Sequence, residues 1–177
     1  MQTLRDPPKK TTSATFRISE EIYEALQEES RMKKTSVNTL INQLLDYWAE
    51  SDRFLEEVGL VRITRSNFKK FLQALPEGKL ADMGKVAGKN VARSYMMAKD
   101  GKISHPGLLH YLRGFAEYGG YAKYNETGTT GRRVIVLMHE LGTAGSVYIS
   151  AYVQSLFELV DSQPVITTTE NSVVVEL

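Results

Sequence analysis

The sequence contains no cysteine among its 177 residues. This absence excludes disulfide bonds and thiolate metal ligands, and with them the disulfide-rich class of small secreted proteins. The sequence also has no apolar run close to the roughly 18 residues that a membrane-spanning helix needs. Residues 1–12 are polar and include Pro7 and Pro8, so this segment lacks the apolar stretch of a signal peptide. We therefore expect a soluble, cytoplasmic protein.

An excess of charge of one sign is also missing, because 22 Lys and Arg residues stand against 21 Asp and Glu residues. Any electrostatic attraction to a nucleic acid must therefore be local. One local excess exists, since residues 60–104 contain ten basic and three acidic side chains, a net charge of +7.

Residues 1–11 contain too little apolar surface to fold alone, and we expect them to form a flexible arm. Ser13–Ile18 then alternates strictly between polar and apolar side chains, which predicts a half-buried strand. Ser19 is a typical helix N-cap, and the apolar stripe after it predicts a helix that runs to about Lys33. Thr35-Ser36 caps a second predicted helix, whose apolar stripe comprises Val37, Leu40, Ile41, Leu44, Leu45 and Trp48.

This unit of one strand and two helices cannot be stable as a monomer. A lone strand has no partner for its backbone N–H and C=O groups, and a chain of about 40 residues buries too little surface. A two-fold partner solves both problems, because two strands can pair into a ribbon while four helices cover its apolar face. Folding and dimerisation are then inseparable.

The unit resembles the ribbon-helix-helix family of DNA-binding proteins, of the Arc, MetJ and CopG type. The resemblance lies in the alternating segment SATFRIS, in the Ser-Glu start of the first helix and in TSVN at the start of the second. It covers residues 12–50. It implies a swapped two-stranded ribbon in a homodimer, and this ribbon enters the major groove of double-stranded DNA.

In such a ribbon the apolar positions point into the dimer core, and the polar positions point to the opposite face. The resemblance therefore implies that Ser13, Thr15 and Arg17 read base edges, with Arg17 able to donate to guanine. Contacts to DNA phosphates are expected at the start of the second helix and from nearby lysines, namely from Lys9, Lys10, Lys34, Ser36, Val37 and Asn38.

One position departs from the family pattern, because the turn between the helices commonly has glycine where this sequence has Lys34. A residue other than glycine costs about 1 kcal/mol in the left-handed conformation. We therefore expect a slightly different turn, which affects the placement of Ser36 but not that of the strand.

Residues 51–59 are expected to extend the second helix as a linker to a domain over residues 60–177. The order of elements in that domain predicts an α+β sandwich with helices on one face of a sheet, and a ferredoxin-like variant is one candidate for its connectivity. Its role would be regulation by a ligand or oligomerisation. The expected helices are 66–75, 80–98, 106–117 and 146–160, and the expected strands are 60–64, 121–125, 133–139, 165–169 and 172–177.

The long helix expected over 80–98 carries two patterns with a spacing of four residues. Lys85, Lys89 and Arg93 form one basic stripe, which either makes accessory contacts to DNA or another anion or is a solvated face. Gly84 and Gly88 would let another backbone approach closely.

The three histidines, His105, His110 and His139, raise the alternative of a metal sensor. We predict no metal site, because the sequence has neither a His-x-His pair nor a cysteine. His139 and Glu140 are a candidate acid–base pair, but no nucleophile accompanies them, so we expect neither catalysis nor a cofactor. The turn over 138–146 contains two glycines and either binds an anion or serves only as a turn, since it lacks the spacing of a phosphate-binding loop.

Together these patterns predict a homodimeric transcription regulator, of the repressor type, that binds specific DNA sequences. Its second domain would sense a small-molecule effector or build higher oligomers. Two alternatives stay open. The N-terminal module could serve only to dimerise an antitoxin-like or other protein-interaction chain, or the second domain could be a small enzyme tethered to DNA.

Overall fold

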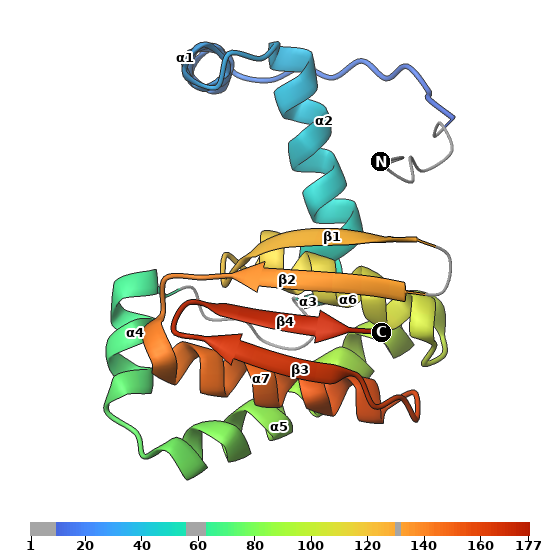
Figure 1. Cartoon of the computed structure of the whole chain (residues 1–177). Helices are drawn as coiled ribbons and strands as arrows, with labels where there is room; N and C mark the ends of the chain where they lie inside the picture. Colours follow the sequence, from blue (N-terminus) through green and yellow to red (C-terminus); the bar gives the residue numbers. More distant parts are fainter. Residues whose placement is uncertain (1–9, 56–62, 130–131) are drawn as a thin grey trace. The chain divides into compact units, whose positions relative to one another are not determined.

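The computed structural model describes residues 10–55, 63–129 and 132–177 (Figure 1). The chain divides into two compact units, Met1–Ala49 and Glu50–Leu177. Together they make an α+β protein, and all the strands among the described residues lie in the second unit.

The N-terminal unit contains helix α1 (Glu20–Met32) and helix α2 (Val37–Tyr47). Both begin where the sequence predicts, because the hydroxyl of Ser19 accepts a hydrogen bond from the amide of Ile22 and that of Ser36 accepts one from Thr39. Helical structure continues beyond α2 in a π-helical turn, η1 (Trp48–Asp52), and in a short helix, α3 (Arg53–Leu55). Residues 51–55 of the predicted helical linker are helical, and residues 56–59 lie outside the described residues.

The strand expected over Ser13–Ile18 is not seen, because residues 10–19 have no regular secondary structure in the single chain. A strand forms only where a neighbouring strand takes up its backbone N–H and C=O groups. The described part of this chain provides no such neighbour, and every strand that it contains belongs to the C-terminal sheet. The ribbon therefore stays an expectation for two chains, and the single chain does not form it.

Four helices of the C-terminal unit lie close to their predicted positions. Helix α4 begins after the N-cap Thr64, and Pro76 separates it from α5. Gly101 ends α5 in the left-handed conformation, with φ of 65°, and Ser104 caps α6. The four helices are α4 (Arg65–Gln73), α5 (Glu77–Asp100), α6 (His105–Glu117) and α7 (Gly142–Glu158).

The sheet consists of two hairpins joined by α7, and its strand order is β1-β2-β4-β3 with every neighbouring pair antiparallel. The ferredoxin-like connectivity is therefore wrong, because that arrangement alternates strands and helices as βαββαβ. Of the strand expected at 60–64, residues 60–62 lie outside the described residues, and Thr64 caps α4 instead. The observed strands are β1 (Lys123–Thr129), β2 (Arg132–Met138), β3 (Val165–Thr169) and β4 (Ser172–Glu176).

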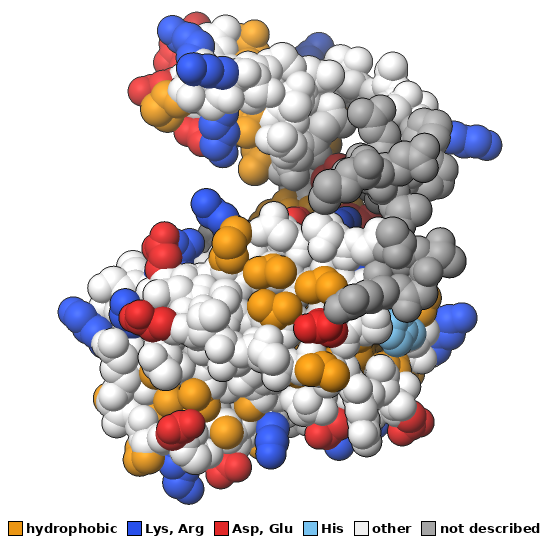
Figure 2. Space-filling model, viewed as in Figure 1, with side chains coloured by type: hydrophobic (Ala, Val, Ile, Leu, Met, Phe, Trp, Pro, Cys, Tyr) orange, Lys and Arg blue, Asp and Glu red, His pale blue; other side chains and the backbone are white. Residues whose placement is uncertain are grey.

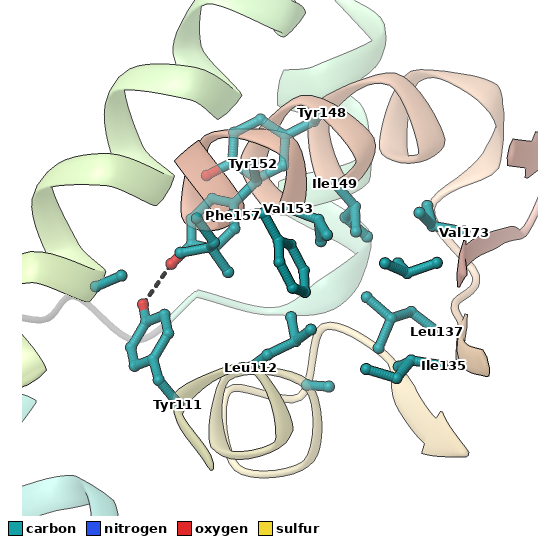
Figure 3. Packing of buried hydrophobic residues seen from close by; sticks show 14 of the residues in the cluster. Tyr111, Leu112, Ile135, Leu137, Tyr148, Ile149, Tyr152, Val153, Phe157 and Val173 are labelled. Atoms are coloured by element: carbon teal, nitrogen blue, oxygen red, sulfur yellow. Dashed lines mark hydrogen bonds between the residues drawn. The ribbon is translucent and has the colours of Figure 1, made fainter. Parts of the chain in front are cut away.

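The core lies between the sheet and the helices, which cover one face of it (Figure 1). Ile135, Leu137 and Val173 project from β2 and β4 toward Ile149 and Val153 of α7 (Figure 3). The alternation of β2 and β4 produces this arrangement, because every second side chain of a strand faces the same way.

Two buried tyrosines add a polar contact to this core. The hydroxyl groups of Tyr111 on α6 and Tyr152 on α7 form a short hydrogen bond with one another (Figure 3). Burial raises the pKa of both phenols, so both stay protonated.

Helices α5 and α7 pack backbone to backbone, as the spacing of Gly84 and Gly88 predicts. A Cβ atom at Gly84 would lie 2.4 Å from the carbonyl oxygen of Tyr148, and one at Gly88 would lie 2.5 Å from that of Tyr152. No side chain larger than hydrogen fits either position without a shift of the helices. The glycines therefore set how close the two helices lie.

Candidate nucleic-acid interface

The N-terminal unit exposes apolar side chains that a stable monomer would bury. Phe16 is 56 % exposed and Ile18 is 43 % exposed, although both belong to the alternating segment. Trp48, which follows α2, is 51 % exposed. Among the described residues of this unit, the buried ones are Ser30 and Leu40. The exposed large apolar side chains of the unit are those of Phe16, Ile18, Ile22, Tyr23, Met32, Leu44, Leu45 and Trp48.

The residues predicted to read bases, Ser13, Thr15 and Arg17, are all exposed and alternate with the apolar residues of the same segment. Their side chains would lie together on one face only if the segment became extended, as it does in a ribbon. In the single chain the structure leaves these three side chains accessible and does not assemble them into a site.

The turn between α1 and α2 does not differ in the way expected from lysine at position 34, because the left-handed conformation is kept. Lys34 has φ of 51°, the left-handed conformation that glycine adopts most easily. Backbone hydrogen bonds close the turn, including one from the amide of Thr35 to the carbonyl of Ser30 over 2.9 Å. The conformation thus forms with lysine in place, and it brings Ser36 to the N-cap of α2.

The start of α2 presents donors that suit a phosphate. The hydroxyl of Ser36 accepts the amide of Thr39 over 3.0 Å, while the amides of Val37 and Asn38 find no acceptor in the described part of the chain. Lys34 is exposed beside them. Lys10 is exposed as well, and Lys9 lies outside the described residues.

Lys33 differs from Lys34, because its ammonium group lies 2.8 Å from the carboxylate of Glu29. The sequence indicates this ion pair by the spacing of four residues on a helix. The pair leaves Lys34 as the cation of the turn that is better placed to meet an outside phosphate.

The predicted basic stripe on α5 is present, and Lys85, Lys89 and Arg93 are exposed along that helix. The adjacent positions Gly84 and Gly88 face α7, so the stripe is carried by the part of α5 that solvent reaches. This arrangement is compatible both with anion contacts and with a solvated face.

The C-terminal unit has an open pocket of about 640 Å³ at the ends of β1 and β2. Its lining includes charges of both signs, namely the cations Arg65 and Lys123 and the anions Glu117 and Glu140. Arg65 is already paired, with its guanidinium 2.9 Å from the carboxylate of Glu140. The pocket therefore has no uniform charge that would select one class of ligand.

His139 and Glu140 do not act on one another in the way that a catalytic pair would. Glu140 is exposed and pairs with Arg65, whereas His139 is buried and binds Ser146 across 3.0 Å. Burial lowers the pKa of His139, which keeps the ring neutral at pH 7. The turn is shorter than the predicted 138–146, because β2 ends at Met138 and α7 begins at Gly142. His139 stabilises it through its hydrogen bonds with Leu141 and Ser146.

A cluster that the sequence did not indicate lies between the start of the C-terminal unit and helices α5 and α6. The ammonium of Lys99 lies 2.5 Å from the carboxylate of Glu50 and 2.6 Å from Nε2 of His110. Burial and the charge of Lys99 lower the pKa of His110. Tyr95 donates a short hydrogen bond to the carbonyl of Glu50. These contacts attach the start of the unit to its helices, and they join residues too far apart in sequence for a pattern to link them.

Each of the three histidines lies in a different setting. His105, the first residue of α6, packs edge to face on Phe157, while His110 and His139 have the partners given above. Within residues 10–55, 63–129 and 132–177, no three His, Cys, Asp or Glu side chains gather as they would to hold a metal ion.

No protein-family model matches this sequence, and no curated protein matches it. None of the described helices is long and apolar enough to cross a membrane.

Proposed function

We propose that this protein is a homodimeric, sequence-specific DNA-binding transcription regulator of the repressor type. In the dimer, the segments Ser13–Ile18 of two chains pair into a ribbon of the ribbon-helix-helix kind. The proposal places the protein in the cytoplasm with the DNA that it regulates.

The exposure of Phe16 and Ile18 carries this proposal. Burial of large apolar side chains stabilises a protein by about 1.5–3 kcal/mol each, and this small unit leaves several of them in water. A second copy supplies the missing cover and the missing strand together. It also brings Thr15 and Arg17 of both chains onto one polar face, which fits the major groove.

The turn before α2 supports the proposal independently. The amides of Val37 and Asn38 point out of a helix N-terminus, where the helix dipole favours an anion. With Lys34 beside them, they can bind a DNA phosphate on each side of the ribbon. The stripe of Lys85, Lys89 and Arg93 is assigned to accessory contacts with the DNA backbone.

The test is binding to a duplex from upstream of the protein's own coding sequence, measured by fluorescence anisotropy over a range of salt concentrations. Thr15→Ala/Arg17→Ala should lose the preference over a random duplex by tenfold or more, since a good base contact is worth about 1–3 kcal/mol. Its salt dependence should stay close to that of the wild type. Glu24→Ala, an exposed change on α1, is the matched control.

A second variant, Lys85→Gln/Lys89→Gln/Arg93→Gln, tests the accessory contacts. Each lost phosphate contact should reduce the salt slope by about 0.9 without changing the sequence preference. The proposed mode of DNA binding is wrong if the ribbon variant (Thr15→Ala/Arg17→Ala) and the α5 variant both bind DNA like the wild type. A protein partner would then explain the exposed apolar residues.

A further inference from the structure

The sheet has a second face, turned away from the core, whose composition the fold does not explain. The strand register aligns three rows of outward positions across it. The middle row consists of Asn125, Val136, Val174 and Thr167. The row on one side of it consists of Thr127, Val134, Glu176 and Val165. The row on the other side consists of Lys123, Met138, Ser172 and Thr169. We call these twelve positions the open face.

The open face is apolar at its centre. Val136 and Val174 are cross-strand partners and are half-buried by their neighbours on the sheet, while Met138 is 45 % exposed and Val165 is 61 % exposed. Figure 2 shows hydrophobic side chains gathered over the sheet. An antiparallel sheet with one solvated face normally carries polar residues there. A second sheet packed on this face would bury its central valines, because the inner faces of two stacked sheets interdigitate.

The charges of the open face suit a second copy of the same chain better than DNA. The described side chains of its three rows include one cation, Lys123, and one anion, Glu176. A face with no net charge does not attract a polyanion, and it does not repel an identical face. In a two-fold pair the same surface lies on both sides of the interface.

The size of the open face indicates when such a pair can form. Four strands about 4.8 Å apart, each about five residues long, cover on the order of 300 Å². A stable interface needs about 800 Å² on each partner. The faces are therefore too small to hold two free chains together, but two units tethered in one dimer meet at an effective concentration near the millimolar range.

We propose that the open faces of two copies pack on one another within the dimer, and form a sandwich of eight strands at its C-terminal end. This pairing rests on the proposed function, because the N-terminal units must first bring the two copies together. Val136 and Val174 of the two copies form the centre of the interface, and the threonines surround them. The C-terminal units thereby add a second contact between the two chains that share one ribbon.

The absence of cysteine makes a direct test possible, because a single introduced thiol has no competitor. Val174→Cys in the full-length chain should give a covalent dimer with a short bis-maleimide. Lys89→Cys, on the exposed part of α5, should not. Adding Val136→Asp to the Val174→Cys chain should abolish the covalent dimer, while adding Val136→Thr should preserve it. Circular dichroism confirms that each variant is folded.

Light scattering on the same samples separates this inference from the proposed function. A dimeric mass together with selective cross-linking at Val174→Cys supports the sandwich. A dimeric mass with no cross-link, and with rapid labelling of that thiol by a bulky single maleimide, overturns the sandwich and leaves the DNA-binding dimer in place. The open face would then be available to a different protein. A monomeric mass with no cross-link overturns both.

Discussion

The imidazole of His139 donates from Nε2 to the hydroxyl of Ser146 over 3.0 Å, in a chain of hydrogen bonds that ends on the turn between β3 and β4. The direction follows from the other ring nitrogen, because Nδ1 accepts the amide of Leu141 and so carries no proton. The Ser146 hydroxyl then donates to the carbonyl of Thr169, 2.6 Å away. Its proton points away from the imidazole, so the pair supports the fold and does not prepare a nucleophile.

Ser146→Ala should therefore destabilise the C-terminal unit. It leaves the N–H of His139 and the carbonyl of Thr169 without this partner, and a buried unpaired polar group costs about 1–3 kcal/mol. Urea unfolding followed by circular dichroism measures the loss. Ser150→Ala is the control, because that hydroxyl bonds only within α7 and is half-buried. Equal effects of the two changes would contradict the role of the chain of bonds.

The stability of the protein should fall as the pH drops below about 6.5, the ordinary histidine pKa. The pKa of His139 is lowered in the folded state by burial, and that of His110 by burial and by Lys99. Over this range the unfolded state therefore binds protons that the folded state does not. The contribution of each histidine to the free energy of unfolding is complete above its unfolded pKa and is lost as the pH falls toward its folded pKa, with a slope of up to about 1.4 kcal/mol per pH unit for each. His139→Gln should reduce that slope, and an unchanged slope would show that another group titrates.

Gly84→Ala should separate α5 from α7. The new Cβ would lie 2.4 Å from the Tyr148 carbonyl and 3.1 Å from the Cβ of Ala151, and overpacking of this kind costs about 1–3 kcal/mol. The matched control is Gly78→Ala on the same helix, where nothing lies within 4 Å. That change should be neutral or stabilise by up to about 1 kcal/mol. Thermal melts of the two variants should shift in opposite directions or differ clearly in size.

Lys34→Gly should stabilise the N-terminal unit by about 1 kcal/mol, because it removes the left-handed strain at φ of 51°. Lys33→Gly should destabilise it, since Lys33 is right-handed, with φ of −83°, and is paired with Glu29. Trp48 is the sole tryptophan of the chain and lies in this unit, so its fluorescence during urea unfolding reports the effect. If Lys34→Gly and Lys33→Gly both stabilised the N-terminal unit, the effect would not be specific to the left-handed residue.

The emission of Trp48 should also report the proposed dimer. The indole is 51 % exposed in the single chain, and cover by a second α2 would shift its emission to shorter wavelength as the protein concentration rises. Phe16→Asp should keep the emission at longer wavelength at every concentration, because it places a charge in the proposed core. Thr15→Ala, the adjacent polar position, should preserve the shift. An emission independent of concentration in a monomeric wild type would contradict the dimer.

Local patterns in the sequence were enough to predict most elements. The caps at Ser19 and Ser36 and the stop at Pro76 act within one or two turns of a helix, so they can be read without knowledge of the fold. The spacing of Gly84 and Gly88 likewise predicts a close helix contact. The sequence also determined that Phe16 and Ile18 alternate with Thr15 and Arg17, which is the basis of the proposed ribbon.

Only the tertiary structure decided which strands become neighbours and which polar groups meet. Pairing of β2 with β4 joins residues separated by a whole helix, and nothing in either strand specifies that partner. The same holds for His139 with Ser146 and for Lys99 with Glu50, because a hydrogen bond or ion pair across the fold leaves no period in the sequence. Periodicity tells which face of an element is buried, whereas the partner of that face depends on how the whole chain, and for the N-terminal unit a second chain, closes over it.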